Sequence, residues 1–338
     1  MSGVEVVAPV TGADSPNETA DRWDIHGTDL GHMFRHDDAL YMVFGDTFGE
    51  GGLGGDNWRS NTMARVADGD PRDGLKFASM ISADDGLAKE LIPSQKLVGI
   101  EKTVIPTYGI SLDGRMYLHY MSVRYWGAPG HWNVRYSGFA YSDDDGQSWH
   151  TPDEAIWPGG TGFEQVALVE QGDYVYSFGI PEGRHGSVRL RRVGPERLLD
   201  RGAYEYWDGD AWVKDASAAR EVVPAPAGEL SVAWSEAHQR WLMMYLHPAR
   251  QEIVLRTAPS LTGPWGEAQT VVTAQEHPGL YSPYIVPTVA PGEEVYFTMS
   301  RWDTYNVYLM RAQLEAGPEL EPGQVIAEPG RGTRPSGG

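Results

Sequence analysis

Short hydrophobic runs recur along the chain, separated by polar stretches rich in Gly, Asp, Asn and Pro. Val, Ile, Phe, Tyr and Trp are frequent within the runs, and such runs bounded by turn residues are typical of β-strands. Two runs joined by a short turn and followed by a third run form a unit that occurs five times, with first runs beginning near residues 28, 103, 163, 229 and 282. This loose period matches a four-stranded blade with its loops and predicts an all-β fold, a five-bladed β-propeller.

The expected strands fall into five groups, and no long amphipathic helix interrupts them. The paired runs are 30–36 with 39–45, 103–111 with 116–122, 163–169 with 174–180, 230–234 with 241–246, and 282–289 with 295–300. Third strands are expected at 60–66, 134–141, 187–193, 252–258 and 306–310, and weaker outer strands at 75–81, 148–151, 203–207 and 265–272. The fifth unit ends after residue 314, so we expect the N-terminal run 4–10 to supply its last strand and close the ring. The predicted domain is therefore 1–314, followed by a Pro- and Gly-rich tail, 315–338, expected to be disordered.

The composition of the chain excludes several classes of binding partner and of chemical site. The 338 residues include 47 acidic and 27 basic residues, a net charge of −20 that argues against nucleic acid and against general adsorption to an anionic membrane. No run is long enough to predict a membrane span, and the N-terminus lacks the pattern of a secretory signal. The absence of Cys excludes disulfides, thiolate metal sites and a Cys nucleophile. We expect no metal or other cofactor, because the His residues lack a metal-ligand spacing.

One hairpin carries an acid near each open end. Asp37 and Asp38 form a two-residue turn, so 36 pairs with 39 and, further along the ladder, Asp29 pairs with Asp46. Directly opposed residues have Cβ atoms about 4.5–5.5 Å apart, and two like charges at that distance are destabilising. The pair therefore favours a functional site. The alternative is structural, with Asp46 capping a turn and Asp29 binding loop amides or a cation.

Propeller topology places other polar residues near this pair, because loops entering first strands and leaving second strands lie on one face. Acids near the entering loops are alternative catalytic acids: Glu101, Glu164 and Glu229. An acidic pocket rimmed by aromatic residues suits glycoside hydrolysis, which commonly needs one carboxylic acid and one carboxylate. The expected substrate-binding residues are Asn61, Arg124, Trp126, Glu182, Arg184, Tyr281, Trp302 and Tyr305. Arg184 has a structural alternative, the neutralisation of Glu182.

Two further motifs bear on the fold. Residues 142–149, Ser-Asp-Asp-Asp-Gly-Gln-Ser-Trp, resemble the Asp-box hairpin of sialidase propeller blades. Residues 257–265 are similar to the connector before an outer strand in five-bladed glycosidases. Both support the propeller and say little about chemistry.

Six segments together resemble a known family. They are His-Gly-Thr-Asp-Leu-Gly (26–31), Phe-Gly-Asp-Thr-Phe (44–48), Trp-Arg-Ser-Asn-Thr (58–62), Gly-Ile-Pro-Glu-Gly-Arg (179–184), Leu-Ser-Val-Ala-Trp (230–234) and Phe-Thr-Met-Ser-Arg-Trp (297–302). They are similar to glycoside hydrolase family 183, formerly domain of unknown function 4185, the endo-D-arabinofuranases. The resemblance covers most of 24–314.

The resemblance implies an inverting endo-enzyme that cuts α-linked D-arabinofuranose chains of mycobacterial arabinogalactan and lipoarabinomannan, with Asp29 and Asp46 as catalytic acids. It leaves open which Asp is the acid, and inversion normally needs carboxyls about 6.5–9.5 Å apart, farther than direct pairing suggests. We expect action outside the cell or in the envelope, by a form whose leader has been removed or by a virion-associated protein such as one of a phage tail. The alternatives are a non-catalytic carbohydrate-binding propeller and a protein-interaction platform.

Overall fold

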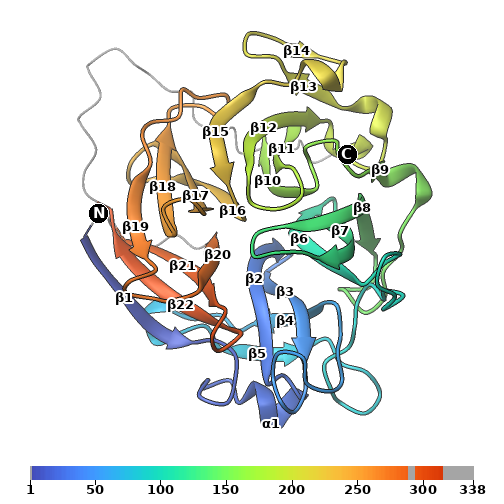
Figure 1. The fold of residues 1–338 in the computed structure, drawn as a ribbon, viewed down its shortest axis with the longest axis vertical. Coiled ribbons are helices and arrows are strands. Elements are labelled where there is room, and N and C mark those ends of the chain that lie inside the picture. The colour runs from blue at the N-terminus through green and yellow to red at the C-terminus, as the bar shows by residue number, and fades with distance from the viewer. Residues whose placement is uncertain (1, 288–293, 315–338) are drawn as a thin grey trace, which may run out of the picture.

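The structure, a computed structural model, describes residues 2–287 and 294–314. Five antiparallel sheets surround a central axis, and β2, β6, β10, β16 and β20 are the innermost strands (Figure 1). This arrangement confirms the predicted five-bladed β-propeller. The predicted tail, 315–338, and the end of the run 282–289 lie outside the described residues.

The blades follow the chain in order, except that the first strand of the sequence belongs to the last blade. Blade 1 comprises β2 (Gly27–His36), β3 (Ala39–Phe48), β4 (Thr62–Val66) and β5 (Phe77–Met80), and blade 2 comprises β6 (Thr103–Leu112), β7 (Arg115–Trp126), β8 (Trp132–Ser142) and β9 (Ile156–Pro158). Blade 3 comprises β10 (Gln165–Gln171), β11 (Tyr174–Ile180), β12 (Gly186–Val193), β13 (Glu205–Trp207), β14 (Trp212–Val213) and β15 (Glu221–Ala227). Blade 4 comprises β16 (Leu230–Ser235), β17 (Arg240–His247), β18 (Glu252–Ala258) and β19 (Gln269–Thr273), and blade 5 comprises β20 (Leu280–Ile285), β21 (Glu294–Arg301), β22 (Asn306–Gln313) and β1 (Ser2–Pro9).

Helices are few and short. One α-helix, α1 (Thr19–Trp23), follows β1. The described residues otherwise contain 3-10 turns at Pro71–Asp73, Asp153–Ala155, Pro195–Arg197, Arg201–Ala203 and Ala216–Ala218. None of the helices in the described part of the chain is long and apolar enough to cross a membrane.

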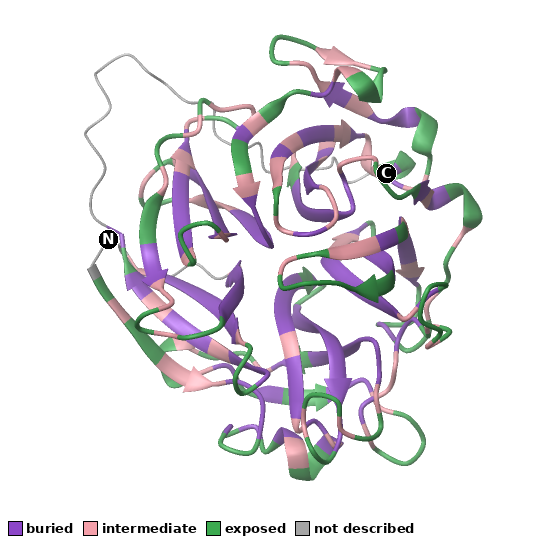
Figure 2. Cartoon of the chain, viewed as in Figure 1, coloured by how far each residue is buried: buried purple, intermediate pink, exposed green. Residues whose placement is uncertain are grey.

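The ring closes as predicted, because β1 pairs with β22 and supplies the outer strand of blade 5. Buried apolar side chains fill the spaces between adjacent blades, and the inner strands are mostly buried (Figure 2). For example, Met42 and Phe44 of blade 1 pack in one cluster with Val307 and Leu309 of blade 5. Burial of both faces of each blade explains why the inner runs are almost continuously apolar.

One predicted outer strand is wrong, and one strand of blade 3 was not predicted. The run 148–151 makes only a single bridge, His150 to Tyr141, and the outer strand of blade 2 is β9. Pro152 has no N–H to extend that bridge into a ladder. In blade 3, the prediction missed β15, which pairs with one end of β12, while β13 pairs with the other end.

Candidate active site

The loops entering the first strands and leaving the second strands lie at one rim of the propeller, which we call the acid rim. The registers show this in every blade: Gly27 pairs with Phe48, Thr103 with Val123, Gln165 with Ile180, Leu230 with Tyr245, and Leu280 with Arg301. The tight hairpin turns between first and second strands lie at the opposite rim. Asp29 and Asp46 therefore belong to the acid rim, near the axis.

The hairpin of blade 1 follows the predicted register at both ends but is irregular where the acids lie. His36 pairs with Ala39 and Thr28 with Thr47, whereas two compensating register shifts fall between Thr28 and His32. The expectation that Asp29 pairs directly with Asp46 is therefore wrong in detail. The reason is that the backbone of β2 bonds to blade 5 at this point instead of to β3. The Leu30 N–H donates to the Ser300 hydroxyl at 3.0 Å.

Backbone conformation and a missing side chain make room for Asp29. Leu30 and Gly31 have φ angles of 68° and 85°, in the left-handed region, so the strand is bulged directly after the acid. A Cβ at position 45 would collide with Oδ1 of Asp29. Gly45 thus permits the close approach of the Asp29 carboxyl to β3.

The Asp29 carboxyl has one paired and one unpaired oxygen. Tyr281 donates a hydrogen bond to Oδ2 at 3.0 Å, while Oδ1 is buried and has no partner among the described residues. Burial, followed by the charge of Asp46, raises the pKa of Asp29 to about 8, although the Tyr281 hydrogen bond and the nearby Tyr305 hydroxyl oppose this rise. Asp29 is therefore mainly protonated at neutral pH.

Asp46 lies in a more polar environment. It is 5% exposed, and its Oδ1 accepts hydrogen bonds from the Trp58 indole N–H at 2.8 Å and from the Thr103 hydroxyl. Burial raises the pKa of Asp46 to about 6, and the two hydrogen bonds and the charges of Lys96 and Lys102 oppose this rise. Asp46 is therefore mainly ionised at neutral pH, and the two acids differ in protonation state.

Blades 3 and 4 contribute a partly buried ion pair beside the acids. The Arg184 guanidinium donates to both oxygens of Glu229, with Nη2 to Oε1 at 2.7 Å and Nε to Oε2 at 3.1 Å. The same guanidinium lies 5.1 Å from the ring centre of Tyr281 and 5.6 Å from that of Trp132. The structural alternative for Arg184 is wrong in its partner, because the acid that it neutralises is Glu229 and not Glu182.

The other two alternative acids are held by local structure. Glu101 accepts hydrogen bonds from Ser122 at 2.7 Å and from Tyr136 at 2.9 Å. Glu164 is fully buried, and Oε1 accepts from the N–H of Thr161 at 2.7 Å while Oε2 accepts from the N–H of Gly162. Both carboxylates thus bind groups of their own blades at the acid rim.

Two of the expected substrate-binding residues have structural partners. Glu182 accepts a hydrogen bond from the Val134 N–H at 2.6 Å and so joins the loop after β11 to β8. Asn61 uses both amide atoms on backbone groups, accepting from the Ile92 N–H and donating to the carbonyls of Ile92 and Val104. We therefore assign Asn61 to loop positioning and not to substrate contact.

The aromatic residues of the acid rim include both buried and exposed rings. Tyr281 and Tyr305 are buried, whereas Trp302 is 59% exposed and lies 5.6 Å from Tyr305 between ring centres. Trp126, on the far side of the Arg184 loop, is 39% exposed, and Arg124 is exposed beside it. Exposed indole faces at two places on the acid rim can stack on sugar rings.

Sequence reasoning missed the groups that tune Asp46. Thr103 is the first residue of β6, and Trp58 lies in the loop between β3 and β4. The Lys96 ammonium lies 4.2 Å from the Trp58 ring centre. The only available signal was the position of Trp58 in the segment Trp-Arg-Ser-Asn-Thr, because contacts between blades are not encoded by spacing.

The centre of the ring below the acids is closed by packed aromatic residues. His32 is fully buried between Tyr108 and Tyr284, with ring centres 5.6 Å away in each case. Burial lowers the pKa of His32 to about 3, so the imidazole is neutral. This histidine does not approach His36, which lies at the opposite rim.

Among the described residues, one group has the spacing of a metal site, and it lies at the opposite rim. His36, Asp37 and Asp145 place one ligand atom each within 4.8 Å of one another. His36 already contacts the Ser111 hydroxyl at 2.8 Å and Asp145 at 3.1 Å, so local partners account for its position.

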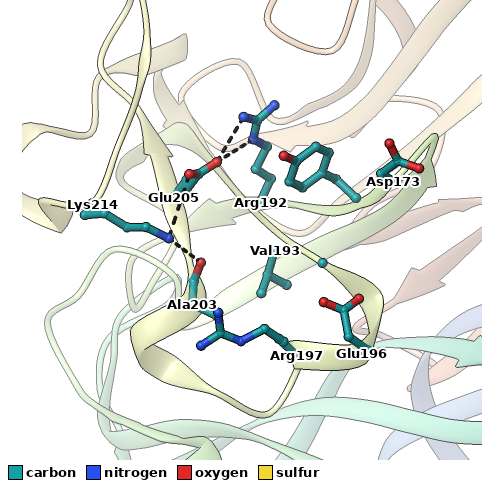
Figure 3. A pocket seen from close by; sticks show the side chains of 10 residues that line it. Asp173, Arg192, Val193, Glu196, Arg197, Ala203, Glu205 and Lys214 are labelled. Atoms are coloured by element: carbon teal, nitrogen blue, oxygen red, sulfur yellow. Dashed lines mark hydrogen bonds and ion pairs between the residues drawn. The ribbon is translucent and has the colours of Figure 1, made fainter.

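A shallow pocket of about 340 Å³ also lies away from the acids, beside the β10–β11 turn of blade 3 (Figure 3). Three of its charged groups are paired with each other, since Glu205 contacts both Arg192 and Lys214. This pocket has no part in the candidate active site.

Comparison with known proteins places this geometry in a family. The model of "Domain of unknown function (DUF4185)" matches residues 14–311, which include strands of all five blades but not β1. The chain belongs to this family. No curated protein matches the sequence.

Solved structures share the fold of this DUF4185 protein. A candidate hydrolase from Bacteroides ovatus superposes with a TM-score of 0.62 at 13% identity, covering 87% of each chain. The RS223 β-xylosidase gives 0.55 at 13% identity over 86% of this chain and 93% of its own. An exo-β-1,3-galactanase from Phanerochaete chrysosporium gives 0.57 at 10% identity over 93% of this chain and 65% of its own. At these identities the likeness shows the propeller fold alone.

Proposed function

We propose that this protein is a glycoside hydrolase that cleaves internal α-D-arabinofuranosyl linkages of arabinogalactan and lipoarabinomannan. The observation that carries the proposal is the buried pair Asp29 and Asp46, whose pKa values of about 8 and about 6 lie on either side of neutrality. Two carboxyl groups with separated pKa values are the arrangement that glycoside hydrolysis requires. The solved glycosidases with the same fold support the reaction class, and the sequence resemblance to endo-D-arabinofuranases supports the substrate.

The environments of the two acids support a different role for each in this proposal. Asp29 is the general acid, because it is protonated at neutral pH and its Oδ1 has no other partner. Asp46 is the general base, because two donors hold its Oδ1 and favour the ionised form.

The reaction balances with these two groups and one water molecule. Asp29 donates its proton to the glycosidic oxygen as the bond to the anomeric carbon breaks. Water attacks that carbon from the other side and gives a proton to Asp46, so the configuration inverts. Asp29 gives a proton and Asp46 takes one, and general acid–base catalysis of this kind commonly contributes about 10²–10⁴-fold to the rate.

The aromatic residues suit a polymer better than a single sugar. Trp302 and Trp126 are exposed on different blades of the acid rim, and Arg184 and Tyr281 lie between them. Rings on both sides of the acids would support sugar units on both sides of the cleaved bond. We propose that the protein acts on this polymer outside the cell or in the envelope, as a secreted or virion-associated enzyme.

The test is product release from purified mycobacterial arabinogalactan. We expect oligosaccharides before free arabinose, and inversion in the first NMR spectra of the products. Asp29→Asn and Asp46→Asn should each reduce release by about 10²–10⁴-fold with unchanged circular dichroism. Glu101→Gln is the matched control and should keep most of the activity.

Other outcomes would contradict the proposal in distinct ways. Full activity of both Asp variants would refute the site. No release by the wild type, with retained binding to the polymer, would identify the second candidate, a carbohydrate-binding propeller, which the exposed Trp302 and Trp126 favour.

A further inference from the structure

The exposed apolar side chains of this protein are concentrated in one place. Eight large hydrophobic residues are exposed in the described part of the chain, and five of them lie in two adjoining segments of blade 2. We call these five the rim patch: Leu97, Val98, Ile100, Tyr125 and Trp126. Val98 is the most exposed at 71%. Scattered apolar residues are normal on a surface, but a contiguous group marks a site of interaction.

The rim patch is held in shape by backbone hydrogen bonds. The N–H of Ile100 donates to the Leu97 carbonyl, and the N–H of Gly99 donates to the Arg124 carbonyl at 2.9 Å. Gly99 has a φ of 86°, which allows this tight turn. The turn therefore presents its aliphatic side chains outward while it is fixed against the end of β7.

The composition of the patch indicates the chemistry of its partner. Val98, Leu97 and Ile100 at the tip have no flat ring face on which a sugar could stack. Tyr125 and Trp126 stand beside the tip, and Arg124 is exposed there without an ion-pair partner among the described residues. Aliphatic residues at a tip, with Tyr, Trp and Arg behind them, form the pattern of a segment that enters a lipid interface.

Charge decides how such a contact would form. The chain carries a net charge of −20, so adsorption of the whole surface to anionic lipid is disfavoured. Arg124 and Lys102 are basic residues next to the tip, and Glu101 between them is buried and hydrogen-bonded. Insertion of the apolar tip would thus drive binding, and the basic groups would meet headgroup phosphates.

We propose that the aliphatic tip of the rim patch, Leu97, Val98 and Ile100, inserts into the interfacial layer of a phospholipid surface. The patch leads directly into β6, whose first residue, Thr103, donates to Asp46. Docking through the patch would hold the acid rim close to the lipid–water boundary. The inference concerns binding alone and stands whether or not the protein hydrolyses arabinan.

The test is co-sedimentation of the full chain with phosphatidylcholine vesicles, with and without phosphatidylglycerol. We expect binding to phosphatidylcholine that persists in high salt, because apolar insertion is not screened. Val98→Ser/Ile100→Ser should weaken partitioning by about tenfold or more, since burying each aliphatic side chain contributes strongly to transfer from water. Val6→Ser, at an exposed valine on β1 outside the patch, is the matched control and should bind like the wild type.

Three results would overturn the proposal. The first is absence of wild-type binding to both kinds of vesicle. The second is equal binding by the patch variant. The third is a dimer of the wild type in sedimentation velocity that becomes a monomer in Val98→Ser/Ile100→Ser, which would make the patch an interface between copies of the chain.

Discussion

The acid rim holds two kinds of buried acidic side chain. Comparing their hydrogen-bond partners distinguishes acids that stabilise the fold from acids suited to catalysis. Glu101 and Glu164 have their oxygens satisfied by hydroxyl and backbone donors of the adjoining segments. Asp29 has a buried oxygen with no donor and lies beside a second acid, Asp46. A buried polar group without its partner costs free energy, so the fold gains stability from the first kind and loses it with the second. Such a cost is typical of a site retained for function.

We expect the largest effect on the free energy of unfolding when a hydrogen-bonded acid of the acid rim is replaced. Glu164→Gln places an NH₂ group against the backbone N–H donors of Thr161 or Gly162, and we expect the free energy of unfolding to fall by about 1–3 kcal/mol. Asp29→Asn should instead increase stability at pH 8, because it removes an acid whose ionisation is unfavourable in the folded state. Urea unfolding at pH 5 and pH 8 measures both. Glu154→Gln, at an exposed residue, is the control and should change little.

The pH dependence of that result follows from the raised pKa of Asp29. The folded protein keeps this proton up to about pH 8, whereas the unfolded chain loses it near the ordinary pKa of an aspartic acid, 3.8. The folded state therefore binds more protons between these values, and stability falls as pH rises through this range. If Asp29→Asn gained no stability relative to the wild type between pH 5 and pH 8, the claim of an unfavourably buried acid would be refuted.

The second effect should appear in the pH profile of hydrolysis. The proposed mechanism needs ionised Asp46 and protonated Asp29, so kcat/KM for hydrolysis should be greatest between about pH 6 and about pH 8. Outside this window it should fall by about tenfold per pH unit on each side. The measurement is the initial rate of oligosaccharide release across pH 4–10. A profile that stays flat through pH 9 would argue against Asp29 as the general acid.

The smallest effect should come from the phenol that bonds Asp29. Tyr281→Phe removes a hydrogen bond that lowers the pKa of Asp29, so the alkaline limb of the profile should move to higher pH. We expect kcat to decrease by about tenfold or less, because the acid itself remains. Tyr296→Phe, a tyrosine bonded to Glu294 away from the acids, provides the control. A lower kcat with an unmoved alkaline limb would limit Tyr281 to substrate contact.

Strand register explains which parts of the site were predictable. The turn at Asp37 and Asp38 and the two apolar runs that flank it placed both acids at the same end of one hairpin, as the structure has them. The bulge after Asp29 was not predictable, because it arises from hydroxyl groups of blade 5 that bond the backbone of Leu30 and Gly31. A local pattern carries no information about a partner some 270 residues away.

The sequence alone determined the fold class, the closing strand and the position of Asp29 and Asp46 at one end of a hairpin, because apolar runs and turn residues are local features of the chain. The outer strand of blade 2 was misplaced, since Pro152 ends the run that the pattern favoured.

Tertiary structure decided the rest of the site. It paired Arg184 with Glu229, engaged Asn61 with backbone groups and brought Thr103 and Trp58 to Asp46. Protonation depends on burial and on neighbours from other blades, so only the closed ring separates the pKa values of Asp29 and Asp46.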